Sequence, residues 1–331
     1  MRTQESNPNS SASRIVHQKE AKPIATDARN DFFAVAFLPD GKHVVSGDTG
    51  GKIRRWRIED GKEVGAPMDG GFLQVSCIAV SRDGKWIVSG TWDGLVTVWN
   101  AETHSKVSQF RAHHCDHPVY AVDISPDGTK IATGSDDHTA CVWSLSTGEQ
   151  LLGPWAHRDT VGVTKFSPDG RLIATVTCND SWAVWVYDSQ NDSLLVKFPV
   201  KVYDLDFDQS IAWANDSKQL FALSHDSYIH HVDVSAKTTL SKWRIHSGLN
   251  ARRIALASDG TFIATSAGSS VSLWNTMSHK RIGPVIKYTH PVTSMAMSSN
   301  YDLVTSGGYS ITLRALCGTS PSPSVDNVSN W

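Results

Sequence analysis

The densest group of side chains that could bind a metal is the run His113, His114, Cys115, Asp116 and His117. Imidazole, thiolate and carboxylate groups are the ligands that Zn²⁺ prefers in proteins. Known metal sites, however, draw on ligands that are at least two residues apart, because adjacent side chains rarely converge on one ion. We therefore predict no metal site in this run.

Other groups that could perform catalysis are scattered. His230 and His231 are neighbours in an expected strand, so their side chains point to opposite faces of the sheet. The many Asp-Gly pairs supply carboxylates, but turn formation accounts for them. The nucleophile motif GxSxG, the metal motif HExxH and the phosphate-binding motif GxxxxGK[ST] are all absent from the sequence. The residues predict neither catalysis nor a cofactor.

A unit of about 42 residues recurs along the chain and must position any functional side chain. Its clearest copy, residues 117–157, contains four short apolar runs separated by turns. Pro126-Asp127-Gly128 favours a tight turn with a positive φ, and the small and β-branched residues around Trp143 suit a strand. Each unit predicts one small sheet of four antiparallel strands.

The unit occurs seven times. We assign one residue in each copy to the position of Trp143, and these residues are Trp56, Trp99, Trp143, Trp185, Val232, Trp274 and Arg314. A length of 331 residues alone would favour two or three domains. Stacked repeats form one continuous body, so we predict a single domain.

Composition excludes several classes of protein. The chain carries 31 basic and 33 acidic residues without a basic stripe, which argues against binding to nucleic acid or to anionic lipid. No run is long and apolar enough to span a membrane. The five cysteines form no CxxC pair, as expected for reduced thiols. We expect an intracellular protein, cytoplasmic or nuclear, because no basic import cluster decides between the two.

The turn Ser-Pro-Asp-Gly, the later Gly-Ser-x-Asp turn and the apolar strand with its tryptophan resemble the WD40-repeat family, whose members form β-propellers. The resemblance covers roughly residues 28–316 and is clearest in the second, third and fourth repeats. It implies an all-β, seven-bladed propeller over residues 14–317. We expect residues 1–13 and the Ser/Pro-rich residues 318–331 to be disordered tails.

The seventh repeat lacks a fourth strand, which would leave an open sheet edge that invites aggregation. We therefore predict that part of residues 14–26 pairs beside residues 310–313 and closes the ring.

The resemblance also implies a set of hydrogen-bonded side chains inside each blade, formed by His, Ser or Thr, Asp and Trp. In the third repeat the matching residues are Thr133, Asp137 and Trp143, and either His113 or His114 supplies the imidazole. In the fourth repeat Asn179 stands in place of the aspartate. The other matching residues are Ser46 and Trp56, Ser89, Asp93 and Trp99, His157, Thr175 and Trp185, Asp226, and Trp274.

In this family one mouth of the propeller presents the residue before the turn aspartate and the early residues of the first strand. Trp155 and Trp182 could extend that surface. Exposed Trp, Tyr and Arg residues are common interface anchors. Alternatively, Phe33 and Tyr120 pack between blades and Trp92 covers a neighbouring loop. The matching residues are Phe33, Trp92, Tyr120, Asp136, His225 and Arg252.

We predict a non-catalytic scaffold or adaptor that binds a protein or peptide partner at this mouth, without a cofactor. Propellers that serve cullin-type ubiquitin ligases commonly carry the motif W-D-x-R at the end of the third strand. None of Trp99, Trp143 and Trp274 begins such a motif. Two alternatives remain: a sensor module of a NACHT-like signalling system, and a propeller hydrolase or lyase with a site in the central tunnel. The sequence does not indicate the oligomeric state.

Overall fold

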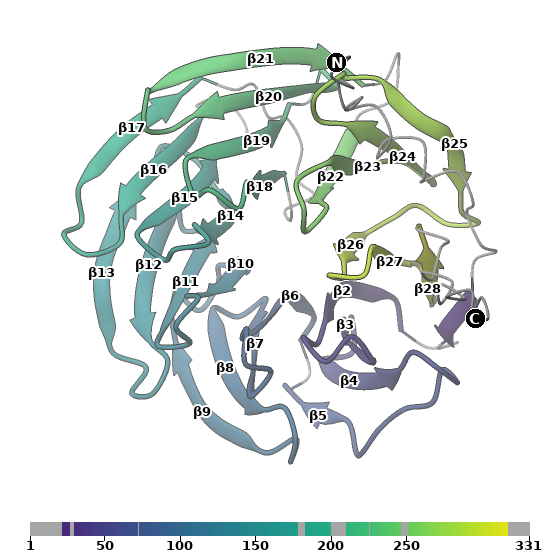
Figure 1. The fold of residues 1–331 in the computed structure, drawn as a ribbon. Coiled ribbons are helices and arrows are strands. Elements are labelled where there is room, and N and C mark those ends of the chain that lie inside the picture. The colour runs from purple at the N-terminus through teal and green to yellow at the C-terminus, as the bar shows by residue number, and fades with distance from the viewer. Residues whose placement is uncertain are drawn as a thin grey trace, which may run out of the picture.

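A computed structural model describes residues 22–26, 30–71, 73–177, 183–199, 210–224, 226–245 and 251–316, except for the side chains of residues 26, 251 and 252. These residues form seven antiparallel four-stranded sheets arranged as blades around a central axis (Figure 1). The prediction of an all-β, seven-bladed propeller is confirmed. The described ranges include no helix that could cross a membrane.

Each blade runs outward from the axis through four strands. The innermost are β2 (Phe32–Phe37), β6 (Val75–Val80), β10 (Val119–Ile124), β14 (Val161–Phe166), β18 (Ile211–Trp213), β22 (Ala251–Leu256) and β26 (Ser294–Met297). The second are β3 (His43–Asp48), β7 (Trp86–Thr91), β11 (Lys130–Ser135), β15 (Leu172–Thr177), β19 (Gln219–Leu223), β23 (Phe262–Ala267) and β27 (Asp302–Gly307).

The third strands are β4 (Lys52–Arg57), β8 (Leu95–Asn100), β12 (Thr139–Ser144), β16 (Val184–Asp188), β20 (Tyr228–Asp233), β24 (Ser270–Asn275) and β28 (Ser310–Ala315). The outermost are β5 (Met68–Asp69), β9 (Lys106–Arg111), β13 (Gln150–Ala156), β17 (Leu194–Phe198), β21 (Thr238–Arg244) and β25 (Arg281–Lys287), with β1 (Lys22–Thr26) in blade seven.

The N-terminal strand closes the ring as predicted. β1 pairs antiparallel with β28, and Lys22 lies opposite Leu313 while Thr26 lies opposite Ser310. The buried Ile24 joins a core cluster that contains Trp56 of blade one and Val304 of blade seven. Blade seven is therefore built from both ends of the described chain. The tails predicted at residues 1–13 and 318–331 lie outside the described residues.

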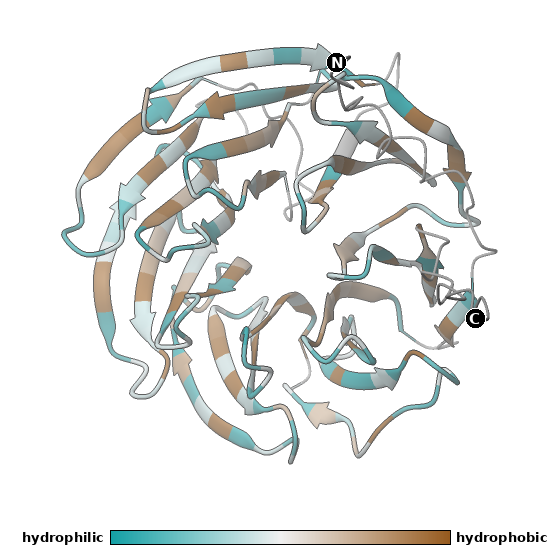
Figure 2. Ribbon diagram, in the orientation of Figure 1, coloured by the Kyte–Doolittle hydropathy of each residue, from teal (hydrophilic) through white to brown (hydrophobic). Residues whose placement is uncertain are grey.

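The core consists of layers between successive blades. Between blades one and two, for example, Val45 and Ile53 pack in one cluster with Ile87 and Trp99. In Figure 2 hydrophobic residues alternate with neutral and hydrophilic ones along the outer strands, whereas most of the turns are hydrophilic. Because both faces of each sheet are covered, a strand such as β3 is buried along nearly its whole length. This packing holds the turns in fixed positions.

The register of blade four corrects one of the tryptophan assignments. In blades one, two and three the tryptophan lies opposite an aliphatic residue of the second strand, as Trp143 does opposite Ile131. The corresponding pair in blade four is Ile173 and Tyr187, whereas Trp185 lies opposite Thr175. Tyr187 therefore occupies the tryptophan position, and the assignment of Trp185 was wrong.

Candidate binding surface at the mouth of the propeller

The innermost strands of five blades carry a β-bulge near their first residue. The pairing skips one residue in each, namely Phe33, Ser76, Tyr120, Gly162 and Arg252. A bulge turns the skipped residue away from the regular ladder. Three of the predicted mouth residues thus share one structural position at the same end of the blades. Phe33 and Tyr120 are partly buried, and the side chain of Arg252 lies outside the described residues.

The turns between the second and third strands lie at this same end. Thr91, the last residue of β7, pairs with Val75, the first residue of β6, and Trp92 follows directly. The Trp92 side chain is 46% exposed, so it is only partly covered by its surroundings. The hydroxyl of Thr91 donates to the Asp93 carboxylate at 2.6 Å, which fixes the turn.

Asp136 has a structural role in addition to its place at the mouth. Its backbone N–H donates to the carbonyl oxygen of Pro118 at 3.1 Å. Its carboxylate accepts a hydrogen bond of 2.7 Å from the hydroxyl of Thr160, a residue that precedes β14. The contact joins blade three to the segment that enters blade four. His225, the remaining predicted mouth residue, lies outside the described residues.

Two further exposed residues lie at the mouth that the sequence reasoning missed. Tyr309 is 49% exposed in the turn between β27 and β28, where the carbonyl oxygen of Gly308 accepts from Phe32 N–H at 2.9 Å. Leu73 is 47% exposed just before β6. Neither residue matches the two positions from which the mouth was predicted, because no aspartate follows Tyr309 and Leu73 precedes the first strand. We call Phe33, Leu73, Trp92, Tyr120 and Tyr309 the mouth group; these residues come from blades seven, one, two and three.

A chain of hydrogen bonds stabilises blade three behind this surface. The indole N–H of Trp143 donates to the Thr133 hydroxyl oxygen at 2.9 Å, and that hydroxyl lies 2.8 Å from Nε2 of His113. Nδ1 of His113 in turn lies 2.9 Å from the Asp137 carboxylate. Each donor has an acceptor if the imidazole is neutral with its proton on Nδ1. Of the two candidate histidines, the structure selects His113.

The carboxyl group at the end of this chain is strongly acidic. Burial opposes ionisation of Asp137, but the interaction with His113 and the hydrogen bonds from Thr139 outweigh it, and the pKa of Asp137 falls to about 2. The Asp137 carboxylate is therefore an acceptor at all physiological pH values.

Among the described residues, the other blades contain only part of this arrangement. In blade two, Asp93 stabilises its own turn, and in blade five Asp226 likewise accepts from the Ser224 hydroxyl. The tryptophan indole donates to a buried hydroxyl in three more blades, through Trp56 to Ser46 at 2.8 Å, Trp99 to Ser89 at 3.0 Å and Trp274 to Thr265 at 3.0 Å.

In the described part of blade four, the expected hydrogen bonds are not formed. Both ring nitrogens of His157, the Thr175 hydroxyl and the Trp185 indole nitrogen are buried without a hydrogen-bond partner among the described residues. The His157 ring instead packs edge-on against Trp185, with ring centroids 5.1 Å apart. Burial, together with the positive charge of Lys197, lowers the pKa of His157 to about 4, so the ring is neutral near pH 7.

Aromatic packing replaces the missing hydrogen bonds in blade four. Tyr187 stacks on Trp155 with ring centroids 4.2 Å apart and nearly parallel planes. Trp155 is buried, and its indole N–H donates to the Asp192 carboxylate. The suggestion that Trp155 extends the mouth surface was therefore wrong. Asn179 and Trp182 lie outside the described residues.

Chemically, the mouth offers aromatic contact surface on fixed turns. The described part of the chain contains no cluster of three or more His, Cys, Asp or Glu residues that could hold a metal ion. Within the run from His113 to His117, His113 is committed to the network of blade three.

A family model described as "WD domain, G-beta repeat" matches residues 22–57, 69–100 and 104–144. The first match begins at β1 and ends in β4, so the repeat unit starts with the outer strand of one blade and continues through three strands of the next. Seven blades with this connectivity complete the pattern. The chain is a WD40-repeat protein.

Two curated relatives illustrate the range of similarity of this WD40 protein. Eukaryotic translation initiation factor 3 subunit I of Pyricularia oryzae is 26% identical over 198 residues, which cover 57% of this chain and 58% of the relative. Actin-interacting protein 1 of Drosophila melanogaster is 21% identical over 280 residues, which cover 82% of this chain and 45% of the relative. The matches thus span less than two thirds of either relative.

Among solved structures, the one titled "Structure of U3-55K" superimposes with a TM-score of 0.77 at 18% identity, covering 89% of this chain and 98% of that chain. The "Crystal structure of RRP9 WD40 repeats" gives 0.75 at 19% identity, with 89% and 97% coverage. At these identities the similarity establishes the fold alone.

Proposed function

We propose that this WD40 protein is a non-catalytic scaffold or adaptor that binds a protein or peptide partner through the mouth group. The observation that carries the proposal is Trp92, an indole 46% exposed on a turn that the hydrogen bond from Thr91 to Asp93 stabilises. Large aromatic side chains contribute a disproportionate share of the energy of protein interfaces. Tyr309 and Leu73 add exposed apolar surface at the same mouth.

The mechanism is pre-organisation. Several described turns of the mouth are held by backbone hydrogen bonds, such as Thr49 N–H to the Asp31 carbonyl at 3.0 Å and Asp136 N–H to the Pro118 carbonyl. A partner therefore binds loops that are already ordered, and little conformational entropy opposes the association.

The names of the relatives support a role in protein assemblies. One relative is a subunit of a translation initiation factor, and another is named for its interaction with actin. Both names describe association with other proteins. We further propose that the protein resides inside the cell, in line with the free thiols of Cys77, Cys115 and Cys141.

Affinity purification with quantitative mass spectrometry tests the proposal. The wild type is compared with a Trp92→Ala, Tyr309→Ala double variant, after both are shown to melt at similar temperatures. Met277→Ala is the matched control, because Met277 is 88% exposed but lies in the turn after β24, at the opposite end of the blades. We expect a partner to be lost from the mouth variant and retained by the control. Identical partner sets for all three proteins would contradict the proposal.

A further inference from the structure

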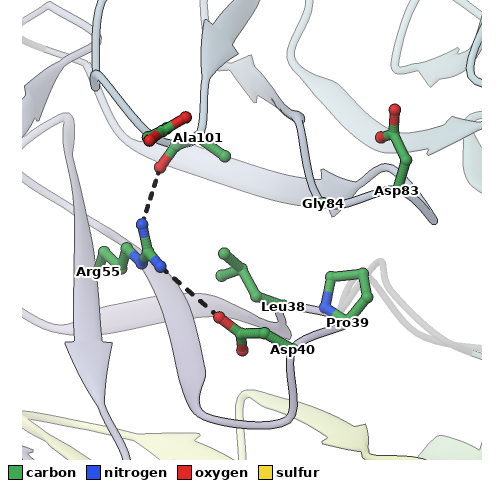
Figure 3. Close-up of a pocket in the computed structure, with 8 residues that line it drawn as sticks. Leu38, Pro39, Asp40, Arg55, Asp83, Gly84 and Ala101 are labelled. Atoms are coloured by element: carbon green, nitrogen blue, oxygen red, sulfur yellow. Dashed lines mark hydrogen bonds and ion pairs between the residues drawn. The ribbon is translucent and has the colours of Figure 1, made fainter.

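A pocket of about 300 Å³ opens on the face opposite to the mouth, between blades one and two (Figure 3). It is lined by the turn after β2, by the turn after β6, by the start of the turn after β8 and by Arg55 of β4. These turns lie at the other end of the strands from Trp92. The pocket is therefore separate from the mouth group.

Arg55 departs from the pattern of the other blades. It lies opposite Val45, on the face of β4 that points toward blade two. The equivalent position is aliphatic in five of the six other blades, and several of these side chains are fully buried. A charged side chain in such a layer is costly unless it is paired. The equivalent residues are Val98, Val142, Val186, His231, Leu273 and Leu313.

The guanidinium of Arg55 forms one wall of the pocket, and its charge is already compensated. It donates to the carbonyl oxygen of Ala101 at 3.1 Å, across the boundary between the blades, and lies 3.6 Å from the Asp40 carboxylate (Figure 3). Nδ1 of His43 lies 2.6 Å from the same carboxylate oxygen. Burial opposes ionisation of Asp40, yet the hydrogen bonds from His43 and the Lys42 backbone lower its pKa.

Two further carboxylates line the pocket and are compensated less. Among the described residues, Asp83 forms an ion pair with Lys85 alone, at 3.2 Å, and Lys85 is 71% exposed, so water competes with this contact. Glu102 is exposed and forms no ion pair with another described residue. A hydrogen bond from the Ser81 hydroxyl, and another from the Lys85 backbone, lower the pKa of Asp83. The lining therefore carries an excess of negative charge at neutral pH.

The rest of the lining is apolar and the space is small. Leu38 and Ala101 are buried, and Pro39 adds a ring at the edge of the pocket. Small-ligand sites typically measure about 300 to 1,000 Å³, so this pocket suits one side chain rather than a cofactor. Long basic side chains lay their methylene groups along apolar surface while the charged end reaches polar groups.

We propose that the pocket binds a lysine or arginine side chain of a protein partner. The aliphatic stem packs on Leu38 and Pro39, and the charged end lies between Asp83 and Glu102. The site is independent of the mouth group, so a partner that uses both contacts two faces of the propeller.

The experiment titrates the full chain with two probes followed by ligand-observed NMR. The probes are Nα-acetyl-lysinamide and its neutral analogue Nα-acetyl-norleucinamide. We expect saturable binding of the lysine probe that weakens as salt is added, and no saturable binding of the norleucine probe. Equal binding of both probes, or no saturation with lysine, would overturn the proposal.

Substitutions of the two carboxylates test whether the lysine probe binds in this pocket. Glu102→Gln should weaken lysine binding about twofold to fivefold, as for one exposed ion pair, and adding Asp83→Asn should weaken it further. Asp127→Asn is the matched control, because Asp127 accepts the same hydrogen bonds from a serine and from the backbone two residues later, but in blade three. The mouth variant should bind the probe like the wild type. An unchanged affinity in the Asp83, Glu102 double variant would refute the assignment.

Discussion

The hydroxyl of Thr133 is the central group of the hydrogen-bond chain in blade three, and Thr133→Val removes it while keeping the shape of the side chain. Thr133 is fully buried. The substitution leaves the Trp143 indole N–H and Nε2 of His113 without their partner. Each buried polar group left unsatisfied costs about 1–3 kcal/mol. Because the groups act in one network, we expect a total loss of about 2–4 kcal/mol in the free energy of unfolding.

Blade four supplies an internal control at the equivalent position. Thr175 is also fully buried, but its hydroxyl has no hydrogen-bond partner among the described residues. Thr175→Val therefore removes a buried polar group without leaving another unsatisfied. We expect this variant to be as stable as the wild type or slightly more stable, by up to about 1 kcal/mol.

The assay is equilibrium unfolding in urea, followed by tryptophan fluorescence, with the wild type and both variants under the same conditions. A lower midpoint at an unchanged slope reports lost stability. We expect this for Thr133→Val alone. Equal losses in the two variants would show that the hydrogen bonds to Thr133 contribute nothing specific, and would refute the reasoning.

Three further predictions concern other parts of the propeller. The pKa of His157 is about 4 in the folded protein, below its ordinary value of 6.5, so the unfolded state binds a proton at this residue more readily. The urea midpoint of the wild type should therefore fall as the pH drops from 6.5 to 4, and that of His157→Phe should fall less steeply. Deletion of residues 1–26, which removes β1, should lower the melting temperature far more than deletion of residues 1–21, and similar melts would contradict closure by β1. Tyr187→Ala should cost about 3–5 kcal/mol in urea unfolding, because the stacked ring is buried, and a loss under 1 kcal/mol would exclude Tyr187 from the tryptophan position.

The period of the repeats was readable because turn residues and apolar runs recur together. Even the closing strand could be predicted, since the seventh repeat had no fourth strand of its own. Blade four was misread because we followed the tryptophan itself, although Tyr187-Asp188 stands where the second repeat has Trp99-Asn100. Pairing with β15 sets the register, and that is a long-range property.

The binding surfaces were harder to predict, for a physical reason. In a sheet with one solvent-exposed face, a charged residue indicates which side of the strand faces water. The blades are covered on both faces, so nothing in the sequence of β4 distinguishes the wall-forming Arg55 from Arg54 and Arg57 around it. Tyr309 escaped notice because no aspartate follows it in its turn, and Leu73 because it precedes the first strand instead of lying within it. The choice of His113 over His114 likewise required coordinates.

The pairing of β1 with β28 also constrains the order of folding. Lys22 and Leu313 meet although nearly the whole described chain separates them. During synthesis β1 emerges before the other described strands and β28 after them, so blades one to six can form while Lys22–Thr26 still has no strand beside it. Ring closure is then a late, long-range event that waits for the C-terminal repeat. A chain stalled on the ribosome before residue 310 would lack β28. The edges of β1 and β27 would then be unpaired, and such exposed edges are typical targets of chaperones.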